Sequence, residues 1–290
     1  MNDSISKLFS LEPYSVPKDQ KNQLFLKAMH DAYKHHFQNC GGYRRFCERR
    51  SLHINSNFKS LKDIPYLPVQ AFKRFSNELT SIPKKNIKTK LQSSATSGIP
   101  STVTIDVITA KRQVRALVST LSKVLGGKRR PFLIFDVDPN KSKSSEIGAR
   151  GAAVRGFLNL ASKASYFMEE SNTFLKFKEK EFLRELRTYE KTDSPVIVFG
   201  FTYVLFASVI DKMYKEGKKF RLPKGSKVVH IGGWKKLEDK KVEKKHFNYL
   251  VSNMLQIKTT DVIDFYGFTE QMGVTYPDAS DNIKCTPIYS

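Results

Sequence analysis

Helical and strand-like patterns of apolar residues alternate along the 290-residue chain. The clearest helical pattern covers 109–125, where apolar residues recur every three or four positions and Gly126 follows as a stop signal. Further helical patterns cover 17–37, 174–189, 203–214 and 237–257. We expect Gly41 and Gly42 to break the chain after the helix over 17–37, because glycine is a strong interrupter of helices.

Short apolar runs lie between these helical segments. They cover 103–107, 131–137, 195–199, 227–231 and 262–265. The runs over 131–137 and 195–199 are the most apolar, and such runs are typical of strands that are buried on both faces. Because the strands alternate with helices, the sequence predicts an α/β fold with layered sheets flanked by helices.

The composition adds a substantial core and a strong positive charge. Apolar residues make up 40% of the chain, which suits one large domain or two modest ones. Lys and Arg number 50 against 28 acidic residues, a formal net charge of +22 that favours polyanionic partners such as nucleotides, lipid head groups or acidic proteins. The cations are spread over nearly every segment, so we interpret most of them as solvated surface and predict no nucleic-acid partner.

Cysteine usage and the apolar runs bear on the compartment. Cys40, Cys47 and Cys285 form no Cys-x-x-Cys pair and no cluster with metal-ligand spacing. Residues 1–11 lack the pattern of a secretory signal, and the longest apolar stretch, 195–210, is interrupted and shorter than a membrane span. We expect a reduced, cytoplasmic protein without a transmembrane segment, for which peripheral membrane contact stays open.

One candidate site is a hydroxyl-rich stretch between two basic segments. It contains, in order, Ser93, Ser94, Thr96, Ser97 and Gly98. Small residues let backbone N–H groups approach an anion closely, and the hydroxyls add further donors. The stretch is therefore a candidate phosphate clamp, and an ordinary solvated loop is the alternative.

A second candidate site follows the last predicted strand. There Tyr266, Gly267, Thr269 and Glu270 form a glycine turn with one hydroxyl beside one carboxylate. In α/β proteins ligands bind outside the carboxyl ends of the strands. Glu270 could hold Mg²⁺ while Thr269 bonds a phosphate. The alternative is that Thr269 and Glu270 cap a following helix.

A glycine pair follows the strand over 227–231. Gly232 and Gly233 would let a flat ring or an acyl chain lie against the backbone, and Trp234 offers a large aromatic face beside them. An ordinary turn with a packing tryptophan is an equally good interpretation.

In this order, the first two stretches resemble the signatures of the adenylate-forming superfamily, which includes acyl-CoA synthetases and luciferases. Residues 93–100 match its Ser/Thr/Gly-rich loop, which ends in Gly-x-Pro-Lys, up to the last position, and 266–270 match Tyr-Gly-x-Thr-Glu in full. A narrower resemblance, from about residue 14 onward, is to the LuxE-type acyl-protein synthetases. It is carried by His-Ile-Gly-Gly-Trp-Lys at 230–235 and Glu-Gln-Met-Gly at 270–273.

The resemblance implies that ATP activates a long-chain fatty acid as an acyl-adenylate, and that the acyl group then moves to a protein thiol. The implied partners are the fatty acid, an acceptor protein and the subunits of a fatty acid reductase complex. For the phosphates, the resemblance implies binding by the loop that includes Thr96, Ser97 and Gly98, a bond from Thr269 to the α-phosphate, and Mg²⁺ binding by Glu270. For the rest of the nucleotide, it implies that Tyr266 borders the adenine and that Gly232, Gly233 and Trp234 make further contacts. For the fatty acid, it implies an acyl pocket that includes Phe201, Thr202 and Phe206.

The chain departs from the superfamily pattern in places. Ser101 stands where the phosphate loop usually has Lys, and Ala95 replaces its middle glycine. By the resemblance, we expect 1–290 to form one core domain, with a helical part over 1–90, an α/β part over 91–290 and the C-terminal lid domain missing. The alternatives are an acyl- or aryl-CoA ligase, or a nucleotide-binding protein without catalysis.

Overall fold

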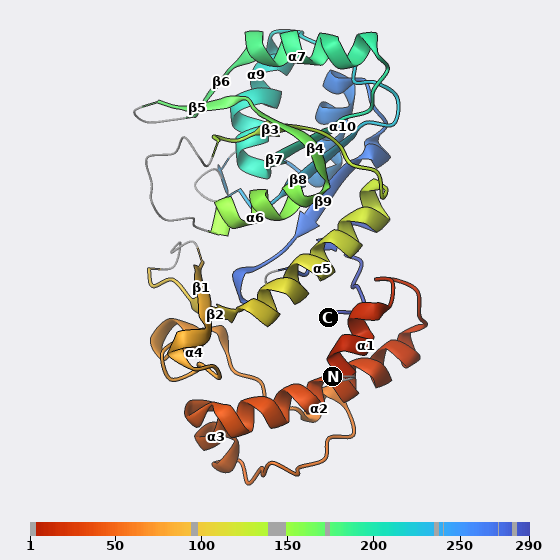
Figure 1. Ribbon diagram of the computed structural model, residues 1–290. Helices are drawn as coiled ribbons and strands as arrows, with labels where there is room; N and C mark the ends of the chain where they lie inside the picture. The colour runs from red at the N-terminus through yellow and green to blue at the C-terminus, as the bar shows by residue number, and fades with distance from the viewer. Residues whose placement is uncertain are drawn as a thin grey trace.

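A six-stranded sheet forms the centre of the C-terminal half in the computed structural model, which describes residues 4–93, 98–138, 149–171, 175–234, 238–239, 241–271, 273–279 and 283–290 (Figure 1). Its strand order is β10-β9-β8-β7-β3-β4. The strands are β3 (Arg130–Phe135), β4 (Ala161–Tyr166), β7 (Ile197–Phe201), β8 (Lys227–Ile231), β9 (Val262–Tyr266) and β10 (Tyr276–Pro277). All pairs are parallel except β10 with β9. The predicted α/β class is confirmed.

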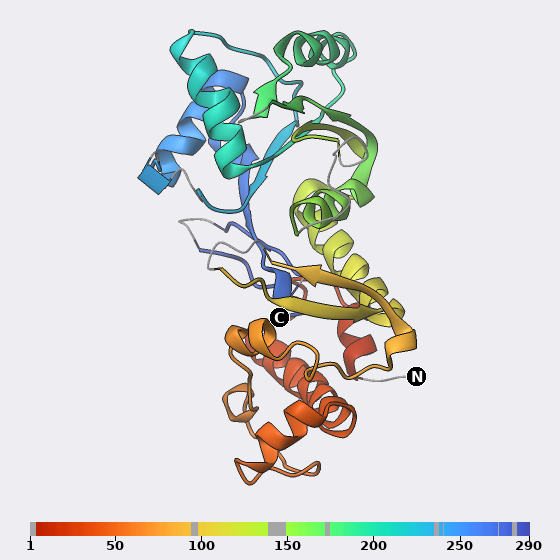
Figure 2. The ribbon, with the colours of Figure 1, turned by 90° about the vertical axis from the view of Figure 1, so that its left-hand side faces the viewer.

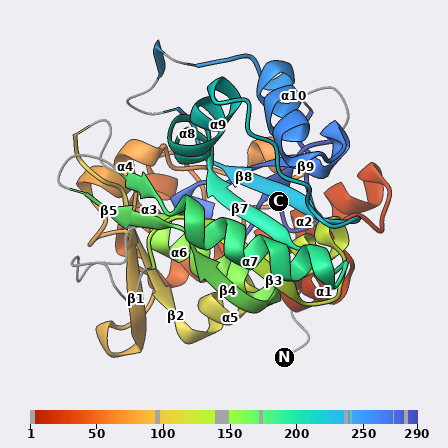
Figure 3. The same cartoon turned by 90° about the horizontal axis from the view of Figure 1, so that it is seen from above.

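Helices cover both faces of this sheet (Figures 2 and 3). One face carries α5 (Val107–Leu125) and α6 (Ala149–Phe157), and the other carries α8 (Thr202–Leu205), the π-helical segment Phe206–Ile210, α9 (Asp211–Lys215) and α10 (Lys244–Leu255). All five residues of β7 are buried. A strand covered on both faces is mostly apolar, which is why β7 appears as an unbroken apolar run in the sequence.

Four helices form the N-terminal part: α1 (Ser4–Ser10), α2 (Lys18–Asn39), α3 (Gly41–Glu48) and α4 (Val69–Arg74). The helix ends at Asn39, close to the expected break, but Gly41 and Gly42 do not cause it, because both glycines belong to α3. The interruption lies at Cys40, which is extended and whose Sγ accepts a hydrogen bond from the Tyr43 backbone N–H at 3.4 Å. Gly42 instead permits a close approach, since a Cβ there would lie 2.7 Å from the Glu78 carbonyl oxygen.

Two predicted helices are shorter than expected. Within 174–189, the segment Leu175–Phe177 is strand β6, which pairs with β5 (Met168–Glu170), and helix α7 covers Glu179–Lys191. The pairing with β5 is a tertiary contact that overrides the local helical pattern. Within 237–257, α10 begins only at Lys244.

The two ends of the described chain pack together beside α5. The Ile288 N–H donates to the Pro13 carbonyl at 2.7 Å, and the Tyr289 ring stacks on Phe9 at 5.1 Å between centroids. The Tyr289 hydroxyl also contacts the Leu11 carbonyl and the Ser119 hydroxyl of α5. These contacts hold the first helices against the α/β half.

An antiparallel hairpin connects the helical part to α5. Its strands are β1 (Ile87–Gln92) and β2 (Thr102–Asp106), so the hydroxyl-rich stretch forms the connection at the hairpin tip. The Asp106 carboxylate accepts the Thr109 N–H at 2.7 Å and caps α5. Among the described residues, no helix is both long enough and apolar enough to cross a bilayer.

The turn after β9 rests on α5 through a glycine. Gly273 has φ +91°, and a Cβ there would lie 2.5 Å from the Gln113 Cα of α5. The backbone therefore demands glycine twice, once for the left-handed conformation and once for the close contact.

We expect Gly273→Ala to destabilise the fold more than Gly217→Ala does. Gly217 also has positive φ (+64°), but nothing lies within 4 Å of the place of its Cβ. The control should cost about 1 kcal/mol for the left-handed conformation, whereas Gly273→Ala should cost about 1–3 kcal/mol more from overpacking against Gln113. Urea unfolding followed by circular dichroism measures both, and equal losses would contradict the contact.

Candidate functional site

A buried hydroxyl joins the hairpin tip to the turn after β9. Ser101 Oγ donates a hydrogen bond to Glu270 Oε1. Ser101 is fully buried, and its backbone N–H donates to Ser93 Oγ at 2.9 Å while its carbonyl accepts the Ser93 N–H at 3.0 Å. Residues 169 positions apart in sequence are thereby fixed side by side.

The acidic turn is a short 3₁₀ segment, Thr269–Gln271. Thr269 is buried and Glu270 is half-buried. Among the described residues, Ser101 is the hydrogen-bond partner of the Glu270 carboxylate. Glu270 Oε2 accepts no hydrogen bond from the described residues. The chain continues into β10 after Gly273, so within the described residues 273–279 no α-helix follows that Thr269 and Glu270 could cap.

An aromatic group borders this turn. Phe268 stacks parallel to Tyr276 with ring centroids 6.4 Å apart, and the Tyr266 ring lies 5.9 Å from that of Phe268. Tyr266 is 55% exposed, and Gly267 lies against Ile231 of β8. An exposed tyrosine face beside a glycine can accept a stacked aromatic ring.

The structure describes the two ends of the hydroxyl-rich stretch. Gly98 has φ +95°, and no described residue lies within 4 Å of the place of its Cβ. Ser93 is held by its hydrogen bonds with Ser101. Ser94, Thr96 and Ser97 lie outside the described residues, so their roles stay predictions.

The glycine pair follows β8, next to the turn after β9. Gly232 has φ +86°, and no described residue lies within 4 Å of the place of a Cβ at Gly233. Trp234 is buried, with its ring 4.9 Å from Phe206 and edge-on to it. The Trp234 ring therefore packs in the core, as expected for an ordinary turn with a packing tryptophan. A nucleotide contact by Trp234 remains a prediction.

The expected acyl-pocket residues are also buried. Phe201 packs at 6.0 Å from Phe199, and Phe206 packs on Trp234 and Phe247. Thr202 follows β7 directly, and its hydroxyl lies 2.9 Å from His230 Nδ1. Their place at the carboxyl ends of β7 and β8 is beside the glycine pair, and their contact with an acyl chain stays a prediction.

His230 is a buried titratable group that the sequence did not single out for a role. It lies in register between Gly200 of β7 and Asp264 of β9, with Nδ1 3.7 Å from Asp264 Oδ1. Its Nε2 has no hydrogen-bond partner in the part of the chain that the structure describes. Burial lowers the pKa of His230 to about 4, and the opposing effect of Asp264 is smaller. The imidazole is therefore neutral at pH 7.

An ion cluster surrounds the far side of Asp264. Lys284 Nζ lies 2.8 Å from Asp264 Oδ2 and 3.0 Å from Asp278 Oδ1, and Lys244 of α10 pairs with Asp278. Burial is the main reason that the pKa of His230 is low, and the positive charges of Lys284 and Lys244 lower it further against the opposing effect of Asp264 and Asp278.

Sequence reasoning missed the roles of Ser101 and His230. Ser101 attracted notice only as the residue that replaces the usual lysine of the phosphate loop, and no spacing rule connects it to Glu270. His230 lies in the 230–235 stretch, but one histidine at the end of an apolar strand carries no sign of its partners in neighbouring strands.

Comparisons with known proteins agree with this architecture. The family model described as acyl-protein synthetase, LuxE, matches residues 2–290. A long-chain-fatty-acid–luciferin-component ligase of Vibrio harveyi is 22% identical over 256 residues, which cover 88% of this chain and 65% of that protein. The enzyme of the same name from Photorhabdus luminescens is 32% identical over 99 residues, 34% of this chain and 82% of that sequence. The chain thus spans about two thirds of the Vibrio relative.

Among solved structures, an open conformation of 2-hydroxyisobutyryl-CoA ligase, in complex with 2-HIB-AMP and CoA, superposes with a TM-score of 0.60. It is 16% identical and the match covers 94% of this chain and 55% of that one. At this identity the likeness shows the fold alone.

We expect acid to destabilise the protein partly through His230. The unfolded chain takes up a proton near pH 6.5, whereas the buried imidazole does so only near pH 4, so stability is lost as the pH falls through this window. His230→Gln should reduce the loss of unfolding free energy between pH 7 and pH 4.5 by about 2 kcal/mol. Urea unfolding at both pH values measures it, with exposed His53→Gln as the control. Equal pH dependence of the two variants would contradict the assignment.

Proposed function

Since the chain belongs to the LuxE family of acyl-protein synthetases, we propose that it activates a long-chain fatty acid with ATP and passes the acyl group to a protein thiol. The observation that carries the proposal is the contact between Ser101 and Glu270. This hydrogen bond joins the base of the candidate phosphate loop to the carboxylate that would bind the metal ion. A single triphosphate must contact both the loop and the metal ion.

The Glu270 carboxylate is suited to bind a Mg²⁺ ion that is also bound by the phosphates of a nucleotide. Mg²⁺ prefers six oxygens and is commonly bound by one or two carboxylates together with substrate phosphates and water. Among the described residues no group of three or more His, Cys, Asp or Glu residues is placed to hold a metal ion by itself. One half-buried carboxylate beside a phosphate loop fits the shared arrangement. Bound there, the ion would neutralise charge on the phosphates.

The proposed first step brings two anions together. A carboxylate oxygen of the fatty acid attacks the α-phosphorus of ATP, the bond from that phosphorus to the bridging oxygen breaks, and pyrophosphate leaves with the electron pair. The fatty acid is its own nucleophile, so the site needs alignment and charge neutralisation more than a base. In this proposal the 93–101 turn binds the β- and γ-phosphates and Thr269 bonds the α-phosphate.

The remaining surfaces would hold the two organic parts. Tyr266 would border the adenine, because its ring is exposed beside the acidic turn. The backbone at Gly233 would approach the nucleotide, since the space above it is open. The long-chain acid follows from the names of the curated relatives, and the protein thiol follows from the description of the family. The second step exchanges the acyl–phosphate bond for a thioester and releases AMP.

We expect the protein to catalyse exchange of labelled pyrophosphate into ATP only when a long-chain fatty acid and Mg²⁺ are present. Glu270→Gln keeps the size of the side chain but removes the negative charge, so exchange should fall about 100-fold or more. Thermal unfolding should change little, because Glu270 is half-buried. Exchange that persists in Glu270→Gln would overturn the metal assignment, and nucleotide binding without any exchange would overturn the ligase proposal.

Ser101→Ala tests whether the buried hydroxyl positions Glu270. Loss of a hydrogen bond to a charged group costs about 1.5–3 kcal/mol, so exchange should fall roughly 10- to 100-fold, with a higher Mg²⁺ requirement. Ser252→Ala is the matched control, since it removes a buried hydroxyl of α10 that donates to the Tyr249 carbonyl. A merely structural role for Ser101 would lower stability in both variants and leave the Mg²⁺ requirement unchanged.

A further inference from the structure

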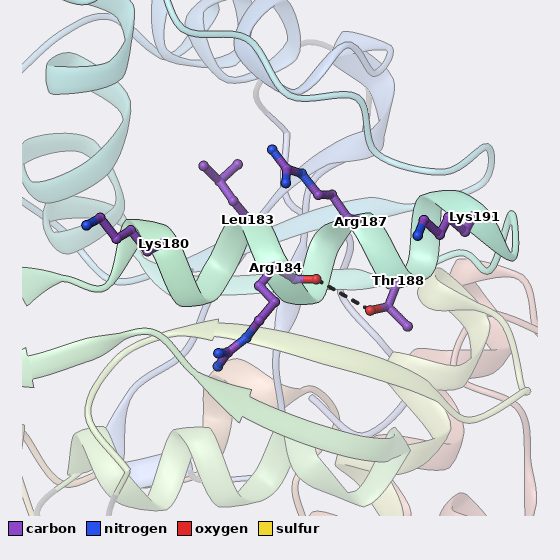
Figure 4. A pocket seen from close by; sticks show the side chains of 6 residues that line it. All are labelled: Lys180, Leu183, Arg184, Arg187, Thr188 and Lys191. Atoms are coloured by element: carbon purple, nitrogen blue, oxygen red, sulfur yellow. Dashed lines mark hydrogen bonds between the residues drawn. The ribbon is translucent and has the colours of Figure 1, made fainter.

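Helix α7 carries four exposed cations along one face. They follow one another at intervals of four, three and four residues, which keeps side chains on one side of an α-helix: Lys180, Arg184, Arg187 and Lys191. At about 1.5 Å per residue this cationic row is about 16 Å long. Its members line a shallow depression of ≈ 530 Å³ together with Leu183 and Thr188, and in Figure 4 all six side chains come from α7.

The cationic row is not neutralised by the rest of the described chain. None of its four members forms an ion pair with a described residue. The nearby carboxylates of α7 are instead paired with lysines from outside the helix: Glu179 with Lys218, Glu181 with Lys178, and Glu185 with Lys163. A helix whose own acids and bases are balanced in number therefore presents a net positive face.

Packing holds this face outward. The Phe182 ring on the opposite side of α7 is fully buried and lies 5.2 Å from Phe135 and 5.3 Å from Phe167. Leu186, one turn further along, is buried as well. Figure 1 shows α7 at the end of the molecule farthest from α2 and α3, so the cationic row lies at an extremity where a broad surface can approach it.

We propose that the cationic row docks the protein on an anionic lipid bilayer. A bilayer with acidic head groups is a broad surface of negative charge, and each Lys or Arg close to it strengthens binding by about fivefold. The inference deepens the proposed function in one respect: a long-chain fatty acid is found mainly in membranes, and docking would bring the site to its substrate.

Other partners fit the row less well. Protein interfaces are centred on buried aromatic or large apolar side chains, and the cationic row has only the half-buried Leu183 between its charges. A helix inserted into a nucleic-acid groove has phosphates on both flanks, and the exposed Glu181 and Glu190 would face them. A flat anionic surface meets the row without meeting these two acids.

The test is sedimentation with vesicles of phosphatidylcholine alone and of phosphatidylcholine mixed with phosphatidylglycerol. We expect binding to the mixed vesicles in dilute buffer, little binding to phosphatidylcholine alone, and loss of binding at about 0.5 M salt. Replacing all four cations of the row by Gln should weaken binding to mixed vesicles at least about 20-fold. The double variant Arg187→Gln with Lys191→Gln should lie between it and the unmodified protein.

The matched control replaces four exposed lysines of the N-terminal part by Gln, namely Lys27, Lys34, Lys59 and Lys62. It removes the same charge and should keep most of the binding. Equal losses in the two fourfold variants, or no retention of the unmodified protein on mixed vesicles, would overturn the proposal. Retention on a DNA duplex but not on vesicles would do so as well.

Failure of the proposed function would be visible separately. Pyrophosphate exchange with a long-chain fatty acid supplied in the absence of vesicles should be the same in the row variant and the control, because no residue of the row belongs to the candidate site. Vesicle binding without exchange in any variant would refute the ligase proposal and leave the docking face supported. Pyrophosphate exchange without vesicle binding would support the ligase proposal and refute the docking proposal.

Discussion

The hydrogen bond from Ser101 to Glu270 is the constraint on which the candidate site depends. It ties a hairpin tip to a turn that follows the last parallel strand. The bond is buried on the Ser101 side, and a second contact supports it where Gly273 rests on Gln113 of α5. Since α5 follows the hairpin directly, both contacts act on one continuous unit of strand and helix, and the acidic turn has little freedom to move away from the candidate phosphate loop.

The contact between Ser101 and Glu270 explains what serine does at the position where the phosphate loop usually has lysine. A lysine at position 101 would bring a cation to the site, whereas Ser101 supplies a neutral donor that leaves the charge of Glu270 in place. The carboxylate then keeps its full attraction for a divalent cation. In the proposed reaction, charge neutralisation of the phosphates would depend on the ion more than on a loop cation.

The sheet explains why three separate stretches come together. Parallel strands place their carboxyl ends at one edge, so the residues after β7, β8 and β9 become neighbours although they are far apart in sequence. Thr202, His230 and Asp264 show the same effect inside the sheet, where one buried imidazole contacts partners from the strands on both sides. His230 is neutral in this position because burial outweighs the attraction of Asp264 and Asp278.

The sequence by itself determined the fold class and most of the sheet. The predicted strand over 195–199 is apolar throughout because both faces are covered, and this pattern is local enough to be visible in one chain. The motif residues Tyr266, Thr269 and Glu270 could be recognised for the same reason, since their meaning lies in adjacent positions. Only the tertiary structure decided that Ser101 bonds Glu270, that Trp234 packs in the core, that Gly42 lies against Glu78, and that the cations of α7 form no ion pair with the described residues. Each of these depends on a partner distant in sequence, and hydrogen bonds, close backbone contacts and ion pairs between distant residues leave no periodic trace along a single chain.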